Sequence, residues 1–338
     1  MHPHGIPQGE LTPGSPLFTH LAQLFETWLN HGRPHLLEML SLDPARPIYL
    51  CRDCPSGARL VCKFFGERPD LPLQECRDLL RHEYRCLRSL RPLGFENGPY
   101  RVVQPLNTAE ELSCLLTEEY VPGRSLDHYI AKACHEGQAE RLHRKLALLA
   151  GFLARLHTAT WSRVQRNFSR IAEAFRSILR VLEAAGVAES AVAGSLNELS
   201  YQWEAQRRMW PAGSCRVHGD VTPTNFIVDG DQLTAIDLER MQMADPAYDV
   251  GMFMAELRHH FALRIQNADG AESFIGEFLR CYVRAVGEGT EFFSDLSFRS
   301  RFFMALGELR IARNEWLPMG HRRWLVEEAR RCLSQECT

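Results

Sequence analysis

The chain has 338 residues, with 39 basic and 42 acidic side chains, and a formal net charge of −3 at pH 7. Because both signs are spread along the sequence without a basic stripe, we expect no nucleic-acid partner. No apolar run approaches the roughly 20 residues that cross a bilayer, so we expect no membrane partner, and the oligomeric state stays open. The length suggests roughly two domains.

The N-terminus and the cysteines favour a cytoplasmic protein. Residues 1–16 lack the cationic start and apolar stretch of a signal peptide, and we expect them to form a flexible tail. Eleven cysteines, an odd number in a large chain, favour reduced thiols. Cys51 and Cys54 form a C-x2-C pair without a second pair to complete a zinc site, so we interpret them as thiols beside a hairpin turn.

Residues 17–121 are expected to form an N-terminal lobe, which begins with an amphipathic helix at 17–30. Strand-like runs at 48–51 and 59–65 flank a turn and predict an antiparallel hairpin. Lys63 lies within the second run and is one of only three lysines among 39 basic residues. A compact ammonium suits two phosphates, so Lys63 is a candidate phosphate ligand. The alternative is an edge lysine that extends to water.

A helix is expected over residues 73–90. Its residues Glu83, Leu87 and Leu90 share one face by their i, i+4, i+7 spacing. We predict that Glu83 pairs with Lys63 and orients it. Glu75 is the competing partner, and Glu83 could instead be a solvated helix charge.

A buried strand is expected from residue 114 to the Pro122-Gly123 break, where we place the lobe boundary. The backbone groups of Glu119 and Val121 could meet an adenine edge, although other strands before turns look similar. Residues 122–338 are then the C-terminal lobe, rich in amphipathic helices. Helices within residues 162–212 could form a substrate lid or plain scaffold.

One segment of this second lobe carries most of the polar residues that chemistry needs. Asp220 and Asn225 fit the D-x4-N spacing, in which the Asp faces an attacking hydroxyl and the Asn holds a metal. An Asp-Gly turn at residues 229–231 predicts a β-hairpin that returns Asp237 to Asn225. The pattern predicts a phosphoryl-transfer site with two adjacent metal-binding oxygens.

One histidine and one aspartate, His157 and Asp249, are interpreted as structural residues. His157 is expected to be a core or helix-end histidine rather than a catalyst. Asp249 is expected to cap a helix over residues 250–260 and to brace the site.

With Lys63, Glu83, His218-Gly219-Asp220, Asn225 and Asp237 in this order, the chain resembles the aminoglycoside phosphotransferase and choline kinase superfamily over roughly residues 34–330. These small-molecule kinases have a protein-kinase-like fold. The resemblance implies an α+β, two-lobed structure with a small antiparallel sheet in the nucleotide-binding N-lobe and a larger, mostly helical C-lobe that carries catalysis and binds substrate.

The resemblance also implies the role of each matching residue. Asp220 would be the catalytic base, and Asn225 and Asp237 would be ligands of Mg²⁺. Lys63 would hold the phosphates of ATP, and His218 would brace the catalytic loop.

The chain departs from the kinase pattern in two places. Residues 42–47 contain no glycine, although a glycine-rich loop normally closes over the phosphates there. Leu238-Glu239 replaces the Phe-Gly that follows the metal-binding Asp in protein kinases. Asp237 and Asp249 are also too close in sequence for an activation segment, which argues for a small substrate.

We therefore expect an enzyme that uses ATP and Mg²⁺ to phosphorylate a hydroxyl of a small molecule. The acceptor remains open among aminoglycosides, choline- or ethanolamine-type amino alcohols, homoserine-like compounds and sugars. ATP and GTP are not distinguished. A non-catalytic nucleotide-binding pseudokinase and a protein kinase are the alternatives.

Overall fold

The computed structural model describes residues 6–29 and 32–334, which separate into two compact units. Unit 1 comprises Met1–Gly123 with Thr234–Glu239, and unit 2 comprises Arg124–Leu233 with Arg240–Thr338. Thr234–Glu239 thus belongs with the N-terminal part, although the sequence placed it within the C-terminal lobe. Among the described helices, none is both long and apolar enough to span a bilayer.

Unit 1 is built on a six-stranded antiparallel sheet with strand order β1-β2-β3-β4-β7-β6. Its elements are β1 (Ile6–Leu11), α1 (Pro16–Trp28), β2 (Leu37–Asp43), β3 (Ile48–Asp53), β4 (Arg59–Phe64), η1 (Phe65–Glu67), α2 (Leu73–Leu90), η2 (Arg91–Leu93), β5 (Tyr100–Val102), β6 (Pro105–Ala109) and β7 (Leu115–Glu119).

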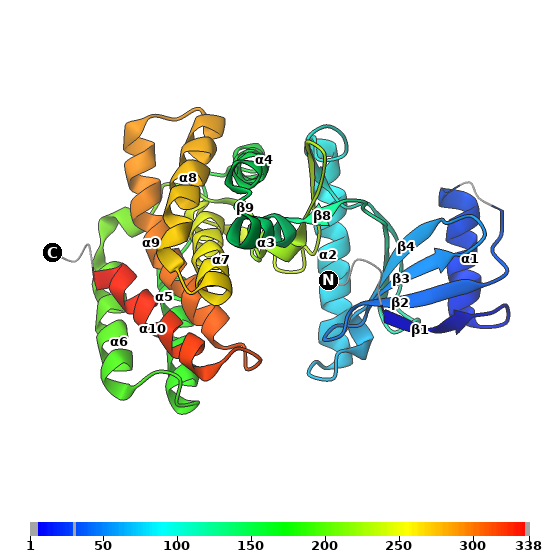
Figure 1. Cartoon of the computed structure of the whole chain (residues 1–338), viewed down its shortest axis with the longest axis horizontal. Coiled ribbons are helices and arrows are strands. Elements are labelled where there is room, and N and C mark those ends of the chain that lie inside the picture. Colours follow the sequence, from blue (N-terminus) through cyan, green and yellow to red (C-terminus); the bar gives the residue numbers. More distant parts are fainter. Residues whose placement is uncertain (1–5, 30–31, 335–338) are drawn as a thin grey trace. The chain divides into compact units, whose positions relative to one another are not determined.

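The two long helices of unit 1 lie on opposite faces of this sheet (Figure 1). Cys62 and Phe64 on β4 point to one face and pack in a buried apolar cluster with α1. Successive strand residues point to opposite faces, so Lys63 between them points to the face that α2 covers. The alternation along β4 therefore aims the lysine at the helix that carries Glu83.

β1 corrects the prediction of a flexible tail over residues 1–16. Residues 6–11 pair with β2 in antiparallel register, from Ile6 opposite Ser41 to Leu11 opposite Leu37, and α1 begins at Pro16. Residues 1–5 lie outside the described residues. The sequence of β1 lacks apolar alternation, so its backbone hydrogen bonds to an exposed sheet edge had no side-chain signature.

Unit 2 is mostly helical, as expected for the larger part of this fold class. Its elements are β8 (Arg124–Ser125), α3 (Leu126–Glu136), α4 (Ala139–Ala159), α5 (Phe168–Ala184), α6 (Ser190–Ala205), η3 (Arg207–Met209), β9 (Cys215–Val217), η4 (Pro223–Asn225), β10 (Phe226–Asp229), β11 (Gln232–Ala235), β12 (Gln242–Ala244), α7 (Ala247–Ile265), η5 (Ala268–Ala271), α8 (Glu272–Val286), α9 (Thr290–Ala312) and α10 (Met319–Ser334). β11 continues from unit 2 into unit 1.

Helices α5 and α6, which occupy the stretch expected to be lid or scaffold, pack into the core of unit 2. Phe175 of α5 and Trp203 of α6 are fully buried, and both rings contact Phe302 of α9. Trp203 also donates a hydrogen bond from Nε1 to the Leu333 carbonyl at 3.0 Å. These contacts are those of scaffold helices.

A short antiparallel pair brings together the two ends of the segment with the D-x4-N pattern. β9 pairs with β12, and Val217 lies opposite Gln242. The segment between these two strands, residues 218–241, therefore begins and ends at neighbouring positions. Within it, the chain turns at Gly230, where φ is +54°, as the Asp-Gly turn predicted.

Candidate functional site

Lys63 of unit 1 lies between two carboxylates. Its Nζ is 2.8 Å from Oε1 of Glu83 on α2 and 3.2 Å from Oε2 of Glu118 on β7. The partner on α2 is thus Glu83 rather than Glu75. Sequence reasoning missed Glu118, because its approach to Lys63 depends on the pairing of β4 with β7.

The electrostatics of this triad keep Lys63 charged. Burial disfavours the ammonium, but the carboxylates of Glu118 and Glu83 outweigh burial and raise the pKa of Lys63. Burial also raises the pKa of Glu83 and of Glu118, and the opposing charge of Lys63 limits both shifts. A fixed ammonium is therefore held at the sheet surface.

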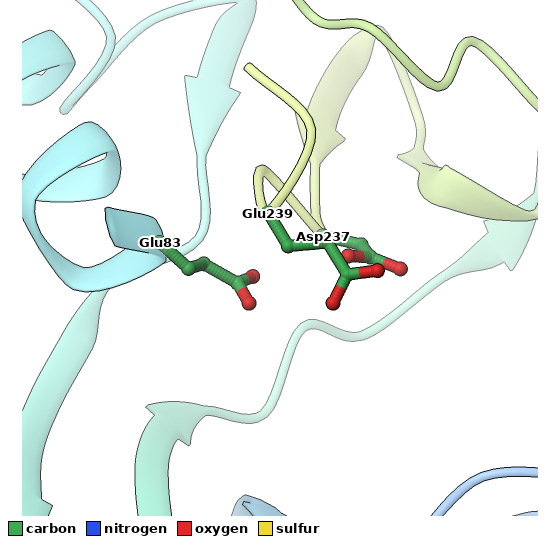
Figure 2. Close-up of side chains that lie close together, drawn as sticks. All are labelled: Glu83, Asp237 and Glu239. Carbon is green, nitrogen blue, oxygen red and sulfur yellow. The ribbon is translucent and has the colours of Figure 1, made fainter. Parts of the chain in front are cut away.

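Asp237 and Glu239 join Glu83 in a cluster of three carboxylates (Figure 2). One oxygen from each lies within 4.8 Å of the others, and all three residues are buried. Asp237 has a left-handed backbone with φ of +62°, and the next N–H, from Leu238, donates to Glu83 Oε1 at 3.2 Å. Clustered carboxylate oxygens are the donors that Mg²⁺ prefers, so the residues of unit 1 fit such a cation.

Two arginines of unit 1 face these carboxylates. Arg46 Nη1 lies 2.8 Å from Asp237 Oδ2, and Arg68 Nη2 lies 2.5 Å from Glu239 Oε2. Together with Lys63, they line a cleft. Neither arginine stood out in a sequence with so many arginines.

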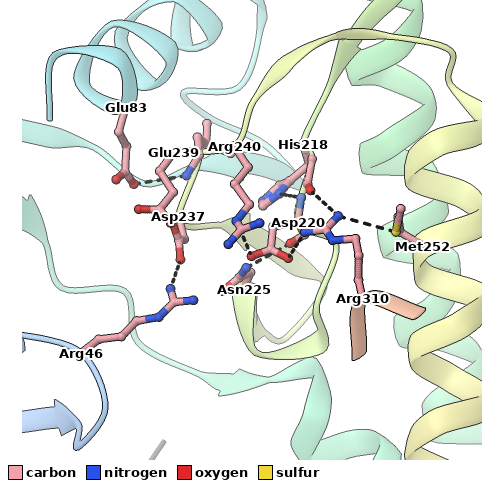
Figure 3. A network of polar contacts seen from close by, with 12 residues as sticks. Arg46, Glu83, His218, Asp220, Asn225, Asp237, Glu239, Arg240, Met252 and Arg310 are labelled. Atoms are coloured by element: carbon pink, nitrogen blue, oxygen red, sulfur yellow. Dashed lines mark hydrogen bonds and ion pairs between the residues drawn. The ribbon is translucent and has the colours of Figure 1, made fainter. Parts of the chain in front are cut away.

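In unit 2, the predicted catalytic loop is held by its own hydrogen bonds (Figure 3). Asn225 donates from Nδ2 to the Asp220 carbonyl at 3.0 Å, and the Asp220 N–H donates to His218 Nδ1 at 3.4 Å. His218 is fully buried, and its ring lies 5.0 Å from that of Phe226.

The Asp220 carboxylate lies between two guanidinium groups. Arg240 Nε is 3.6 Å from Oδ2, and Arg310 Nη2 is 3.7 Å from Oδ1. Arg310 also donates to the Tyr248 hydroxyl at 2.9 Å and to the Gly219 carbonyl at 3.4 Å. These contacts fix the orientation of a carboxylate that is partly exposed, and sequence reasoning foresaw neither arginine.

Gly219 occupies a position that excludes other residues. Its φ is +83°, and a Cβ there would lie 2.1 Å from the Arg240 carbonyl oxygen. The loop of Asp220 therefore runs directly against the backbone of Arg240, which explains the glycine between His218 and Asp220.

Asp249 braces this loop, but not as a helix cap. Helix α7 already begins at Ala247, so Asp249 lies within its first turn. The carboxylate accepts the backbone N–H of His218 at 2.7 Å and of Gly219 at 3.0 Å. His157 contacts the same carboxylate at 3.1 Å and is a buried structural histidine, as expected.

The adenine contacts expected at the end of β7 stay a prediction, and the structure limits one of them. The Glu119 N–H already donates to the Gln104 carbonyl at 3.0 Å, so this group is not available to an adenine edge. The Glu119 carboxylate accepts from the Gln104 N–H at 2.9 Å. Val121 follows the strand at a half-buried position.

Comparison with known proteins supports a kinase-like fold. The family model described as "Phosphotransferase enzyme family" matches residues 47–282. A search of curated proteins finds no match.

Solved structures with the same fold include three small-molecule kinases. Aminoglycoside phosphotransferase APH(2″)-Ib bound to ADP aligns with a TM-score of 0.58 at 14% identity, over 94% of this chain and 97% of that one. Ethanolamine kinase of Plasmodium vivax aligns with a TM-score of 0.56 at 14% identity, over 89% and 82%. Choline kinase LicA of Streptococcus pneumoniae aligns with a TM-score of 0.53 at 17% identity, over 95% and 99%.

Proposed function

This chain belongs to the phosphotransferase enzyme family, and from that premise we propose that it transfers the γ-phosphoryl group of ATP to a hydroxyl of a small molecule. The observation that carries the proposal is the Lys63 ammonium held between Glu83 and Glu118. A buried lysine that keeps its charge is suited to binding phosphate oxygens.

The proposed chemistry assigns a task to residues of each unit. In unit 1, Lys63 would hold the phosphates and Asp237 would supply an oxygen ligand for Mg²⁺. In unit 2, Asn225 would supply a second oxygen ligand. Mg²⁺, when bound, would offset the negative charge of the phosphate oxygens.

Asp220 would orient the acceptor hydroxyl and accept its proton. The flanking Arg240 and Arg310 would hold the carboxylate in position, and His218 and Asp249 would hold the loop beneath it. Catalysis would then come mainly from positioning and electrostatics rather than from a covalent intermediate.

A small acceptor is supported by the short sequence between Asp237 and Asp249, which leaves no room for an activation segment that would hold a protein substrate. A choline-type cation would favour an aromatic cage, but Tyr282 and Trp316 of unit 2 are poor candidates to line one. Tyr282 is 1% exposed and bonded to His157, whereas Trp316 is 72% exposed. The structures with the same fold include kinases of aminoglycosides, ethanolamine and choline, so these acceptors are the first to test.

The proposal is tested by measuring ADP release from ATP with aminoglycosides, macrolides, choline, ethanolamine and homoserine-like compounds. We expect one acceptor class to stimulate ADP release, and chelation of Mg²⁺ to stop it. Nucleotide binding without stimulated release, over the whole panel, would favour the pseudokinase alternative. Transfer to casein or to the chain itself would favour a protein kinase.

A further inference from the structure

The turn between β2 and β3 raises the question of what contacts the phosphates in place of a glycine-rich loop. Its backbone N–H groups are already used or absent. The Ala45 N–H donates to Asp43 Oδ1 at 2.9 Å, the Arg46 N–H to the Asp43 carbonyl at 3.3 Å, and the Ile48 N–H to the Arg46 carbonyl at 2.8 Å. Residues 44 and 47 are prolines and have no N–H. The turn thus offers no backbone donors to an anion.

The same turn does offer a side-chain donor. Arg46 reaches from it into the cleft, where its guanidinium meets Asp237, and Figure 3 shows this pair. The Arg46 side chain is 38% exposed, whereas that of Asp237 is 9% exposed. The carboxylate is therefore fixed and buried, and the guanidinium is the partner with room to move.

Arg68 repeats this arrangement at Glu239. Its guanidinium pairs with Glu239 and lies 5.2 Å from the centre of the Phe65 ring, and the side chain is 22% exposed. Both arginines and Lys63 line the cleft with Asp237 and Glu239. Two guanidinium groups thus face the carboxylates that fit a divalent cation.

Resting on the proposed function, we propose that Arg46 and Arg68 bind the polyphosphate of the nucleotide and replace the backbone donors of a glycine-rich loop. Buried carboxylates need a counter-charge, and the arginines supply it when no cation is bound. With a divalent cation bound by these carboxylates, Arg46 and Arg68 would instead contact the phosphate oxygens, whose geometry their planar fork matches.

The first test is calorimetric titration of the wild-type chain and of Arg46→Ala and Arg68→Ala with ATP and with adenosine, in Mg²⁺. We expect each substitution to weaken ATP binding by about tenfold and to leave adenosine binding unchanged, because adenosine has no phosphate. Arg46→Lys should restore only part of the loss, because an ammonium lacks the fork. Arg52→Ala is the matched control, since Arg52 pairs with Glu38 on the same sheet and does not line the cleft.

A second measurement, made without nucleotide, tests whether Arg46 balances the charge of Asp237. Titration with Mn²⁺, monitored by electron paramagnetic resonance, should show several-fold tighter binding to Arg46→Ala than to wild type, because a competitor for Asp237 is gone. A purely structural Arg46 would not tighten cation binding.

The outcomes separate this inference from the proposed function. Wild-type ATP affinity in both alanine variants, or equal losses for ATP and adenosine, would overturn the role of the arginines while leaving a phosphotransferase. Failure of the wild-type chain to bind ATP at all would overturn both.

Discussion

Asp237 shows how one residue combines an unusual backbone with a polar role. Its φ of +62° is uncommon for a residue other than glycine, although Asp and Asn tolerate this region better than most. The Leu238 N–H that follows is bound by Glu83, which fixes the peptide. Local strain of this kind is found at functional sites, and here it directs a carboxylate into the cleft.

Substitutions at Asp237 should separate conformation from charge. We expect Asp237→Asn to unfold within about 2 °C of wild type, because Asn tolerates the left-handed region, yet to lose at least about 100-fold in turnover. Asp237→Ala should lose similar activity and unfold at a lower temperature. Thermal unfolding by circular dichroism and a steady-state assay check both statements, and an Asn variant with full turnover would remove Asp237 from the site.

The ion pair of Lys63 with Glu83 was predictable because each residue is conspicuous within its own element. Lys63 and Glu83 emerged because a lone strand lysine and a helix carboxylate on an apolar face are each conspicuous within one element. Glu118 and the two arginines of the cleft were not, since their roles arise from strand pairing and from turns between distant segments.

At the scale of elements, helix α7 supports the loop of Asp220 through a single carboxylate. Asp249 lies in the first turn of α7 and accepts two loop N–H groups at once, so the loop is attached to a core helix. The sequence indicated a bracing role, but a helix cap was the wrong geometry, because helix boundaries are the least predictable feature of a pattern.

Removing this carboxylate should loosen the loop as well as the fold. Asp249→Ala leaves two buried N–H groups unpaired, so we expect a loss of roughly 2–4 kcal/mol in the free energy of unfolding and a lower kcat. Denaturant unfolding and kinetics measure these effects. Asp229→Ala, at an exposed position on β10, is the control and should change neither; equal stability of the two variants would argue against the brace.

Elements with strong periodicity were predicted well, and elements without it were not. Helix α2 spans Leu73–Leu90, as its apolar spacing predicted. β1 was missed because its sequence lacks the apolar alternation that is typical of a strand. The sequence also did not predict that Thr234–Glu239 belongs to unit 1, because this depends on contacts with residues that are distant in the sequence.

At the scale of the whole molecule, the core of unit 2 contains a carboxyl group that should make stability depend on pH. Glu308 on α9 is 1% exposed, neither of its oxygens has a hydrogen-bond partner among the described residues, and Arg258 Nε lies 3.9 Å away. Burial raises the pKa of Glu308 to about 8 from an ordinary value of 4.5, against the opposing charge of Arg258. Between pH 4.5 and about 8, Glu308 is therefore protonated in the folded chain and ionised in the unfolded chain.

The stability contributed by this proton is fully present below pH 4.5 and is lost as the pH rises towards 8. We expect Glu308→Gln to raise the melting temperature by about 3 °C or more at pH 8 and to change it little at pH 5. Glu198→Gln, at an exposed site on α6, is the control. A Glu308→Gln effect of equal size at both pH values would contradict an ionisation of Glu308.

The central claim is phosphoryl transfer that depends on Asp220, and one measurement tests it most directly. The chain and its Asp220→Asn variant are incubated with Mg²⁺, an acceptor library and ATP labelled with ¹⁸O in the γ-phosphoryl group, and the products are read by mass spectrometry. We predict a small molecule that gains one labelled phosphoryl group with the wild-type chain and at least about 100-fold less of it with the variant. Equal product from both proteins, or no labelled product although ATP binds, would contradict the account.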